Sequence, residues 1–358
     1  MSEGLFFQVL RYSVGASTEM PAGISSSEWE QVYEMARRQS LLGIIFYGIQ
    51  KNGAEKPDKK VLFQWFSVSE QIRQGNQKAN CAAVEAARFF QENGFRTCIL
   101  KGQGNALHYP DPYVRTSGDI DIWVEGGLRK VLAFARKYAP GSKCCYHHIE
   151  FMKIGGVETE VHYRPSFMNN MLHNRRMQRW FEGVAGEQFV HEVELPDKAG
   201  TVCVPTNGFN RIYQMAHISN HFFHEGIGLR QIVDYYFVLK QGFTEKERTE
   251  DERLLKRLGL HGMAAAVMYV LKVVLHLDDR SMLVPVDERR GRLLLDEILL
   301  SGNFGQHDKR IRHDGSQLTH NIQRLRRDFR LVCYFPSECL CEPVFRTWHF
   351  FWRLFHRR

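Results

Sequence analysis

The residues best suited to chemistry are Asp119 and Asp121, which stand one residue apart at the start of an apolar run. Alternation along a strand puts both carboxylates on one face, while Ile120, Ile122 and Val124 point to the opposite face and can pack in a core. Two parallel carboxylates repel each other unless a cation lies between them. Such oxygen ligands suit one or two magnesium ions that also coordinate substrate phosphates, although a lone pair of this kind also fits a solvated strand end.

A third carboxylate is available in the run of residues 157–163, VETEVHY. As a strand, this run puts Glu158, Glu160 and His162 on one face. If the strand lies beside the one that carries Asp119, we expect Glu160 to complete a metal site, with His162 next to it. Glu158 is nearer the turn and is expected to be exposed.

A glycine turn precedes the aspartates. The segment ILKGQGN, residues 99–105, predicts the end of a strand, a turn at Gly102 and Gly104, and the start of a helix. Backbone N–H groups in such a turn can bind phosphate oxygens. Alone, this GxG pattern is equally typical of an ordinary tight turn.

The surrounding elements predict an α+β protein. Helices are predicted at residues 26–51 and 59–93, 128–138, 208–224, 229–240, 251–258, 263–277 and 287–300. Strands are predicted at 97–100 and 120–124, with one helical turn at 105–109 and a hairpin of 147–154 and 157–163 closed by two glycines. We therefore expect a helical region at 1–94, a mixed sheet core at 95–204 and a helical region at 205–358.

Composition excludes disorder and favours anionic partners. The 358 residues are 44% hydrophobic and 25% charged, with a net charge of +8 that suits nucleotides, nucleic acid or a lipid surface. The eight cysteines lack paired C-x-x-C spacing and are interpreted as reduced thiols. Residues 1–15 make a poor signal peptide and residues 263–277 are too short to span a bilayer, so we expect no transmembrane segment and a cytoplasmic location.

Histidines and an arginine on the later helices are further candidates. His217, His221 and His224 share one side of a helix and are expected to line a pocket or pack internally, with zinc binding as the alternative. Arg230 is expected to pair with Asp234 one turn away, or else to reach a substrate phosphate. The pair at residues 147–148 is expected on the hairpin surface, with the active sheet face as the alternative.

Most of the positive charge lies near the C-terminus. Residues 306–358 contain eleven Lys and Arg against five Asp and Glu, mixed with aromatic residues. This tail predicts contact with RNA or an anionic membrane surface. The alternative is an amphipathic helix that buries Trp348, Phe351 and Leu354 against the rest of the protein.

Together these motifs resemble the nucleotidyltransferase superfamily that contains DNA polymerase beta. The strings LKG, RTSGDIDIWV, VETEVHYRP and HFFHEGIGLRQIVDYYFVL resemble an uncharacterised bacterial nucleotidyltransferase-like family over residues 95–240. The resemblance implies a polymerase-beta-like core flanked by helical regions. Gln103 departs from the pattern, because a second Gly or Ser usually follows the first glycine.

The resemblance implies transfer of a nucleoside monophosphate from an NTP to an acceptor, with release of pyrophosphate. Asp119, Asp121 and Glu160 would be catalytic and would hold magnesium, with two ions expected. The acceptor stays open between a small molecule, a protein and RNA, and a non-catalytic nucleotide-binding or regulatory role is the alternative. The implied nucleotide contacts are Lys101, Gly102, Gln103, Gly104 and Arg115, and the substrate-pocket candidates are His162, His217, His221 and Arg230.

Overall fold

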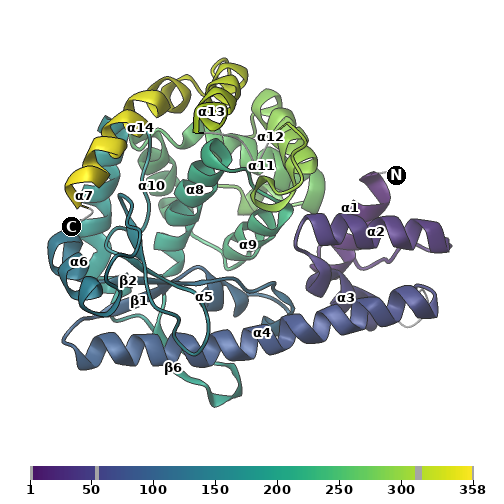
Figure 1. Ribbon diagram of the computed structural model, residues 1–358. Coiled ribbons are helices and arrows are strands. Elements are labelled where there is room, and N and C mark those ends of the chain that lie inside the picture. The colour runs from purple at the N-terminus through teal and green to yellow at the C-terminus, as the bar shows by residue number, and fades with distance from the viewer. Residues whose placement is uncertain (1–2, 53–55, 311–316, 357–358) are drawn as a thin grey trace.

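A mixed four-stranded sheet lies at the centre of the protein, surrounded by helices. The computed structural model describes residues 3–52, 56–310 and 317–356 (Figure 1). The strand order is β1-β2-β4-β3, in which β1 (Thr97–Leu100) is antiparallel to β2 (Ile120–Val124), and β2 is parallel to β4 (Thr159–His162). The strand β3 (His148–Glu150) forms the predicted hairpin with β4, shorter than expected because only one isolated bridge joins the chain near the turn. The α+β prediction is confirmed.

The two faces of the sheet have different roles. Ile99, Ile122 and Val161 point to one face and belong to a buried apolar cluster with α4 (Lys59–Glu92) and α6 (Gly127–Tyr138). Alternation therefore sends Asp121 and Glu160 to the other face. The predicted packing of the apolar side of β2 is confirmed, and it fixes the strand that carries the aspartates.

The N-terminal part contains α1 (Glu3–Ser13), α2 (Ser26–Arg38) and α3 (Leu42–Lys51), followed by the long α4. The predicted single helix at 26–51 is wrong, because Ser40 adopts a positive φ of 56° and separates α2 from α3. The prediction for α4 is confirmed, since the helix ends at Glu92 and Gly94 follows with φ 78°. This helix runs from the N-terminal helices to the underside of the sheet (Figure 1).

The later helices follow the apolar spacing closely. They are α8 (Asn207–His224), α9 (Leu229–Lys240), α10 (Glu245–Arg257), α11 (His261–Leu275) and α12 (Glu288–Ser301). They share one large buried cluster with α1, α2 and α3, and this cluster also includes Leu100 and Trp123 of the sheet. The division at residues 94 and 204 stays a prediction.

Other elements escaped prediction or differ from it. The helix α7 (Met171–Gln188) and the hairpin of β5 (Glu192–Leu195) and β6 (Gly200–Cys203) have no counterpart among the predicted elements. The turn predicted at 105–109 is also wrong, because the short helix α5 (Gly102–Ala106) begins directly at the glycine turn.

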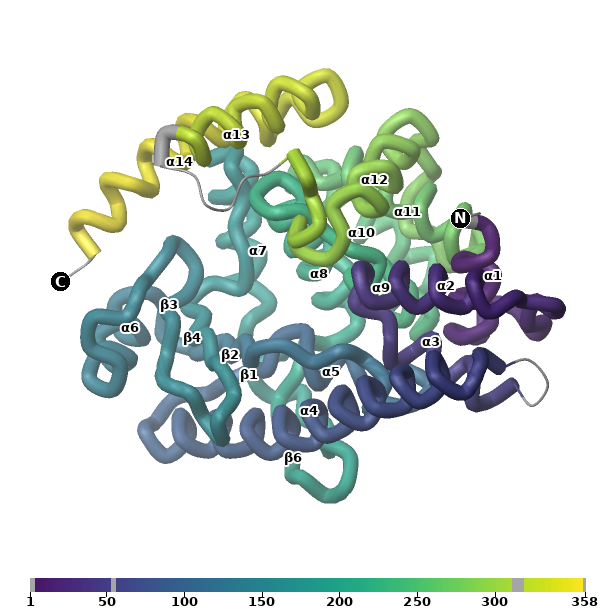
Figure 2. Tube along the Cα trace, turned by 45° about the vertical axis from the view of Figure 1, so that its right-hand side comes forward, coloured from purple at the N-terminus to yellow at the C-terminus, as the bar shows by residue number. Residues whose placement is uncertain are grey.

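The C-terminal tail forms two helices, α13 (Gln317–Leu331) and α14 (Pro336–His356), at the opposite end of the molecule from α4 (Figure 1, Figure 2). The alternative of an amphipathic docked helix is correct in kind, and of its three named residues Trp348 packs partly buried against the core while the other two do not. Phe345 and Trp352 are buried, whereas Phe351 and Leu354 are exposed. The last two arginines, at 357 and 358, lie outside the described residues. Within the described ranges, no helix has the length and apolar character needed to cross a membrane.

Candidate active site

Three carboxylates converge on the polar face of the sheet. Asp121 of β2 and Glu160 of β4 are direct neighbours in the parallel register, and Asp119 immediately precedes β2. One oxygen from each of the three lies within 4.8 Å of the others. Oxygen donors at this spacing fit a hard divalent cation such as magnesium. Glu158, by contrast, is exposed, as the sequence predicted.

Two cations already contact the central carboxylate. Lys101 Nζ lies 2.8 Å from Asp121 Oδ2, and His162 Nε2 lies 2.8 Å from Asp121 Oδ1. His162 Nε2 is also 3.5 Å from Glu160 Oε2. Burial disfavours the charged imidazole, but its hydrogen bonds to Asp121 and Glu160 raise the pKa of His162 to about 9. His162 therefore acts as a buried cation that holds two of the carboxylates in place.

The carboxylates differ in charge balance. Burial favours a neutral Asp121, but the contacts with Lys101 and His162 hold its pKa well below the usual range. Asp119 forms no ion pair among the described residues, and Lys101 lowers its pKa by less than Asp121 raises it. The negative charge of Asp121, and then burial, raise the pKa of Asp119 to about 6. Uncompensated negative charge therefore remains at the exposed edge of the cluster, where a metal ion would be stabilised.

The carboxylates open into a cavity of about 530 Å³, a size typical of ligand pockets. Its lining comes from the sheet, from α8 and α9, and from the C-terminal helices. The sequence-predicted residues in the lining are Lys101, Gly102, Arg115, Asp119, Asp121, Glu160, His162, His217, His221, His224 and Arg230.

The glycine turn contributes only part of its length to the cavity. Lys101 has φ 52° and ψ −120°, a conformation that favours glycine, and Gly102 follows with φ 25°. Gln103 and Gly104 are buried and do not line the cavity. A Cβ on Gly104 would lie 3.1 Å from the side chain of Val204, so this glycine allows close packing. Gln103 and Gly104, both predicted to contact the nucleotide, therefore pack in the protein interior and do not contact the cavity.

Arg115, which was predicted to contact the nucleotide, pairs with a carboxylate of the protein instead. Its Nε and Nη2 donate to the two oxygens of Asp234 at 2.8 and 2.9 Å, and Tyr109 Oη donates to Asp234 Oδ1 at 2.7 Å. The predicted pair of Arg230 and Asp234 is wrong, since no ion pair joins them among the described residues. Arg230 instead donates to the carbonyl of Thr116 at 3.0 Å, and its buried Nε has no partner within the part of the chain described.

The three histidines of α8, His217, His221 and His224, line the cavity. The prediction that they line a pocket is therefore confirmed. The rings of His217 and His221 are 4.2 Å apart, and His221 Nδ1 lies 3.0 Å from Glu225 Oε2. Burial lowers the pKa of His224 to about 3, so this imidazole is neutral. The described residues place these histidines in no cluster of three converging metal donors.

A family model described as an uncharacterised nucleotidyltransferase matches residues 25–277. The chain belongs to this family. The matched range exceeds the resemblance seen in the sequence and includes every predicted site residue. Neither a curated protein nor a solved structure gives a significant match.

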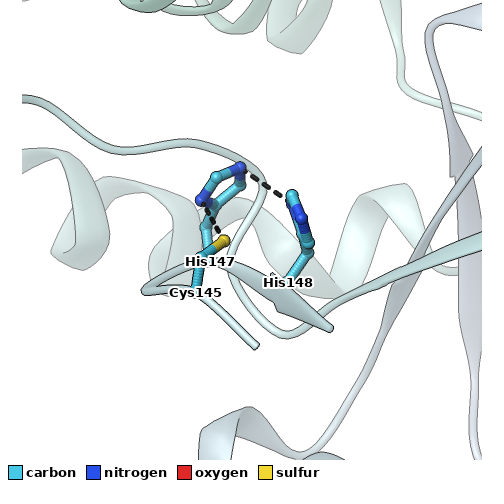
Figure 3. Close-up of side chains that lie close together, drawn as sticks. All are labelled: Cys145, His147 and His148. Carbon is cyan, nitrogen blue, oxygen red and sulfur yellow. Dashed lines mark hydrogen bonds between the residues drawn. The ribbon is translucent and has the colours of Figure 1, made fainter. Parts of the chain in front are cut away.

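In this nucleotidyltransferase-family chain, Cys145, His147 and His148 form a row of neighbouring side chains just before and at the start of β3 (Figure 3). Cys145 Sγ lies 3.2 Å from His147 Nδ1, His147 Nε2 lies 3.0 Å from His148 Nδ1, and His148 Nδ1 lies 3.2 Å from Glu160 Oε2. Burial lowers the pKa of His148 to about 4 and raises that of Cys145 to about 11, so both are neutral. Donor atoms of Cys145, His147 and His148 also lie within 4.8 Å of one another, a spacing that a soft divalent ion could use.

The surface location expected for the two hairpin histidines is wrong, since both line the cavity. A signal for this was present in the sequence. Pairing across the predicted hairpin sets His148 opposite His162, on the same face as Glu160. The arginine partner Asp234 had no comparable signal, because its contact joins residues far apart in the chain.

Proposed function

We propose that the protein transfers a nucleoside monophosphate from an NTP to an acceptor hydroxyl, using magnesium held by Asp119, Asp121 and Glu160. The convergence of these three carboxylates beside a ligand-sized cavity carries the proposal. The raised pKa of Asp119 supports it, because the cause is repulsion from Asp121 that a cation would relieve. The three carboxylates would hold magnesium, and two ions would suit this donor set.

The acceptor oxygen would form a bond to the α-phosphorus, and the bond from that phosphorus to the bridging oxygen of the β-phosphate would break. Pyrophosphate leaves with that oxygen, and the hydroxyl proton passes to solvent. Bound magnesium would stabilise charge on both the attacking and the leaving oxygen.

The chain's own residues would bind and orient the two substrates. Lys101 Nζ and the backbone at Gly102 would contact triphosphate oxygens, and Arg230 lines the same cavity with its guanidinium over the ring of Phe304. Arg115 would act indirectly, because its pairing with Asp234 fixes the loop that leads to Asp119. His217 and His221 would contact the substrate from α8.

The test is calorimetry of the purified protein with each NTP, with and without magnesium. Binding is expected to require magnesium, to be lost in Asp121→Asn, and to persist in Glu158→Gln, a matched control at an exposed carboxylate of the same β-run. Wild-type affinity in Asp121→Asn would overturn the metal assignment. Release of labelled pyrophosphate by the wild type in an acceptor screen, absent in Asp121→Asn, then tests transfer itself.

A non-catalytic nucleotide-binding or regulatory role is the second candidate. It is favoured by the contacts of Asp121, both of whose oxygens already accept a bond from Lys101 or His162. Under this alternative, magnesium and NTP bind without release of pyrophosphate for any acceptor tried.

Contact with nucleic acid or an anionic surface through α13 and α14 is a third candidate. Phe350, Phe351 and Phe355 are exposed next to Arg353, as stacking or insertion would require. RNA binding that weakens steeply with salt would support it. We propose a cytoplasmic location, since NTP is supplied there and all eight cysteines are unpaired.

A further inference from the structure

A second cavity adjoins the carboxylate cavity and is lined mainly by arginines. Its volume is about 460 Å³, and it lies between α13, the end of α8 and the segment before residue 310. Two carboxylates, Glu225 and Asp308, are part of the lining. The arginines of this cavity, which we call the arginine cavity, are Arg310, Arg324, Arg326, Arg327 and Arg330.

Some of these arginines are neutralised by the protein and others are not. Arg310 and Arg330 both contact Glu297, at 2.8 and 2.9 Å. Arg324 lies 3.9 Å from Glu342. In contrast, Arg326 and Arg327 have no carboxylate within 4.0 Å among the residues described.

Arg327 is the most informative of the set. Its residue is only 8% exposed, and its one described hydrogen bond runs from Nη2 to the carbonyl oxygen of Glu225, at 3.1 Å. Burial lowers the pKa of Arg327, which reflects the cost of holding this cation away from water. Glu297 and Asp308 act on this cation only from beyond 4.0 Å, so a buried Arg327 without a direct ion pair among the described residues is costly, and an anion in the cavity would offset that cost.

The arginine cavity and the carboxylate cavity adjoin each other and share part of their walls. His224, Glu225, Phe304 and Arg324 belong to the lining of both. One ligand can therefore occupy the arginines with one end and the carboxylate cluster with the other. Because every arginine of the cavity lies beyond residue 277, where the family match ends, the match does not account for this site.

We propose that the arginine cavity binds a phosphate group of the acceptor, so that the acceptor is a phosphorylated molecule whose hydroxyl reaches the carboxylate cluster. Planar guanidinium groups bind phosphate through paired hydrogen bonds, which suits Arg326 and Arg327, the two arginines of the cavity without an ion pair among the described residues. The inference rests on the proposed function, because only an NMP transferase needs an acceptor here. A phosphorylated small molecule and an RNA end share the required chemistry.

The first test is a calorimetric titration of the protein with inorganic phosphate, in the absence of metal and nucleotide. Binding is expected to weaken about tenfold or more in Arg327→Gln, since a hydrogen bond to a charged group is lost. Arg326→Gln, at an exposed position, should weaken binding even if the buried variant folds poorly. Arg253→Gln removes the same charge at an exposed position outside both cavities and should bind phosphate as the wild type does.

Asp121→Asn separates this inference from the proposed function. Phosphate binding should persist in Asp121→Asn, which is expected to lose magnesium and NTP binding. Failure of magnesium-dependent NTP binding in the wild type would count against the proposed function alone. Equal phosphate affinity in the wild type and Arg327→Gln would overturn the arginine site, as would loss of phosphate binding in Asp121→Asn.

Two further measurements test whether the arginine cavity binds the acceptor rather than the nucleotide. Arg327→Gln should keep the wild-type affinity for magnesium and NTP, and a parallel loss would assign the arginines to the nucleotide and overturn the proposal. Ribose 5-phosphate and a short single-stranded RNA are then tested as competitors of bound phosphate. Tighter competition by either one supports the proposal and identifies the source of the phosphate. If neither competes, the cavity holds an adventitious ion only, and the acceptor assignment fails.

Discussion

Lys101 Nζ lies 2.8 Å from Asp121 Oδ2, which puts an ammonium group at the carboxylate that would bind metal. The backbone of Lys101 reaches this position through a positive φ of 52°, which costs a side-chain-bearing residue roughly 1–3 kcal/mol. Lys101 and His162 together leave Asp121 charged but compensated. Asp121 therefore keeps its charge without metal, while Asp119 remains repelled by it, and an incoming metal ion must share Asp121 with two cations.

Replacing Lys101 by Met is expected to change the binding of metal and nucleotide in opposite directions. Free magnesium should bind about tenfold more tightly, because a competing positive charge is removed. Magnesium-bound NTP should bind more weakly, because the ammonium no longer contacts phosphate. Calorimetry with each ligand measures both effects, and Lys101→Arg, which keeps the charge, is the control. A change of the same sign for both ligands would contradict this role of Lys101.

Asp234 is expected to be the strongest polar determinant of stability near the site. It accepts bonds from Arg115 and Tyr109 in a fully buried setting, so Asp234→Ala should lower the free energy of unfolding by about 3 kcal/mol. Tyr109→Phe removes one bond and should cost about 1 kcal/mol. Urea denaturation measures both. Equal midpoints for Asp234→Ala and the wild type would refute the network.

Much of the site could be predicted from the sequence because it depends on local periodicity. Alternation on β2 and β4 assigned Asp121, Glu160 and His162 to one face, and the glycine pair at 155–156 assigned the hairpin. In a hairpin, the length of the turn and the alternation of side chains fix which residues of the two strands lie opposite each other. The positions of Lys101 and the α8 histidines around one cavity followed once the elements were in place.

The remaining contacts depend on how distant elements pack. A helix salt bridge between Arg230 and Asp234 fits the spacing rule, yet the buried Arg115, 119 residues away, takes the carboxylate. Spacing rules cannot show that Arg115 pairs with Asp234 in preference to Arg230, because the buried ion pair forms only when distant parts of the chain have packed together. The break at Ser40 is similar, since a single left-handed residue interrupts an otherwise continuous helical pattern.

The docked face of α14 is a third case and is open to a direct test. Trp352 is 9% exposed and its ring stacks 4.1 Å from that of His356, whereas Phe355 is 82% exposed. Trp352→Ala should destabilise the protein by about 3 kcal/mol, and Phe355→Ser should change stability by less than about 0.5 kcal/mol. Denaturant midpoints measure the difference. Comparable losses in both variants would mean that α14 docks by another face.

The pair of Asp328 and Glu342 links α13 to α14 through buried carboxylates. Asp328 Oδ2 and Glu342 Oε2 are both buried, and Glu342 Oε2 lies 3.4 Å from Arg346 Nη2. Because two neighbouring buried carboxylates repel each other, we expect this pair to share a proton. Burial, and then the neighbouring Glu342, raise the pKa of Asp328 to about 7, although Arg346 and Arg327 oppose the shift. In the folded protein this carboxyl therefore keeps its proton well above its ordinary pKa of 3.8.

Stability is consequently expected to fall as pH rises between the ordinary pKa of Asp328 and its folded value near 7. In this window the folded state binds more protons than the unfolded state, so each rise in pH favours unfolding. Melting temperatures of the wild type should drop by several degrees between about pH 5 and about pH 8. Asp328→Asn supplies a permanent hydrogen-bond donor and should flatten this part of the profile, while leaving titrations elsewhere in the chain intact. An Asp328→Asn profile parallel to that of the wild type would exclude a shared proton at this pair.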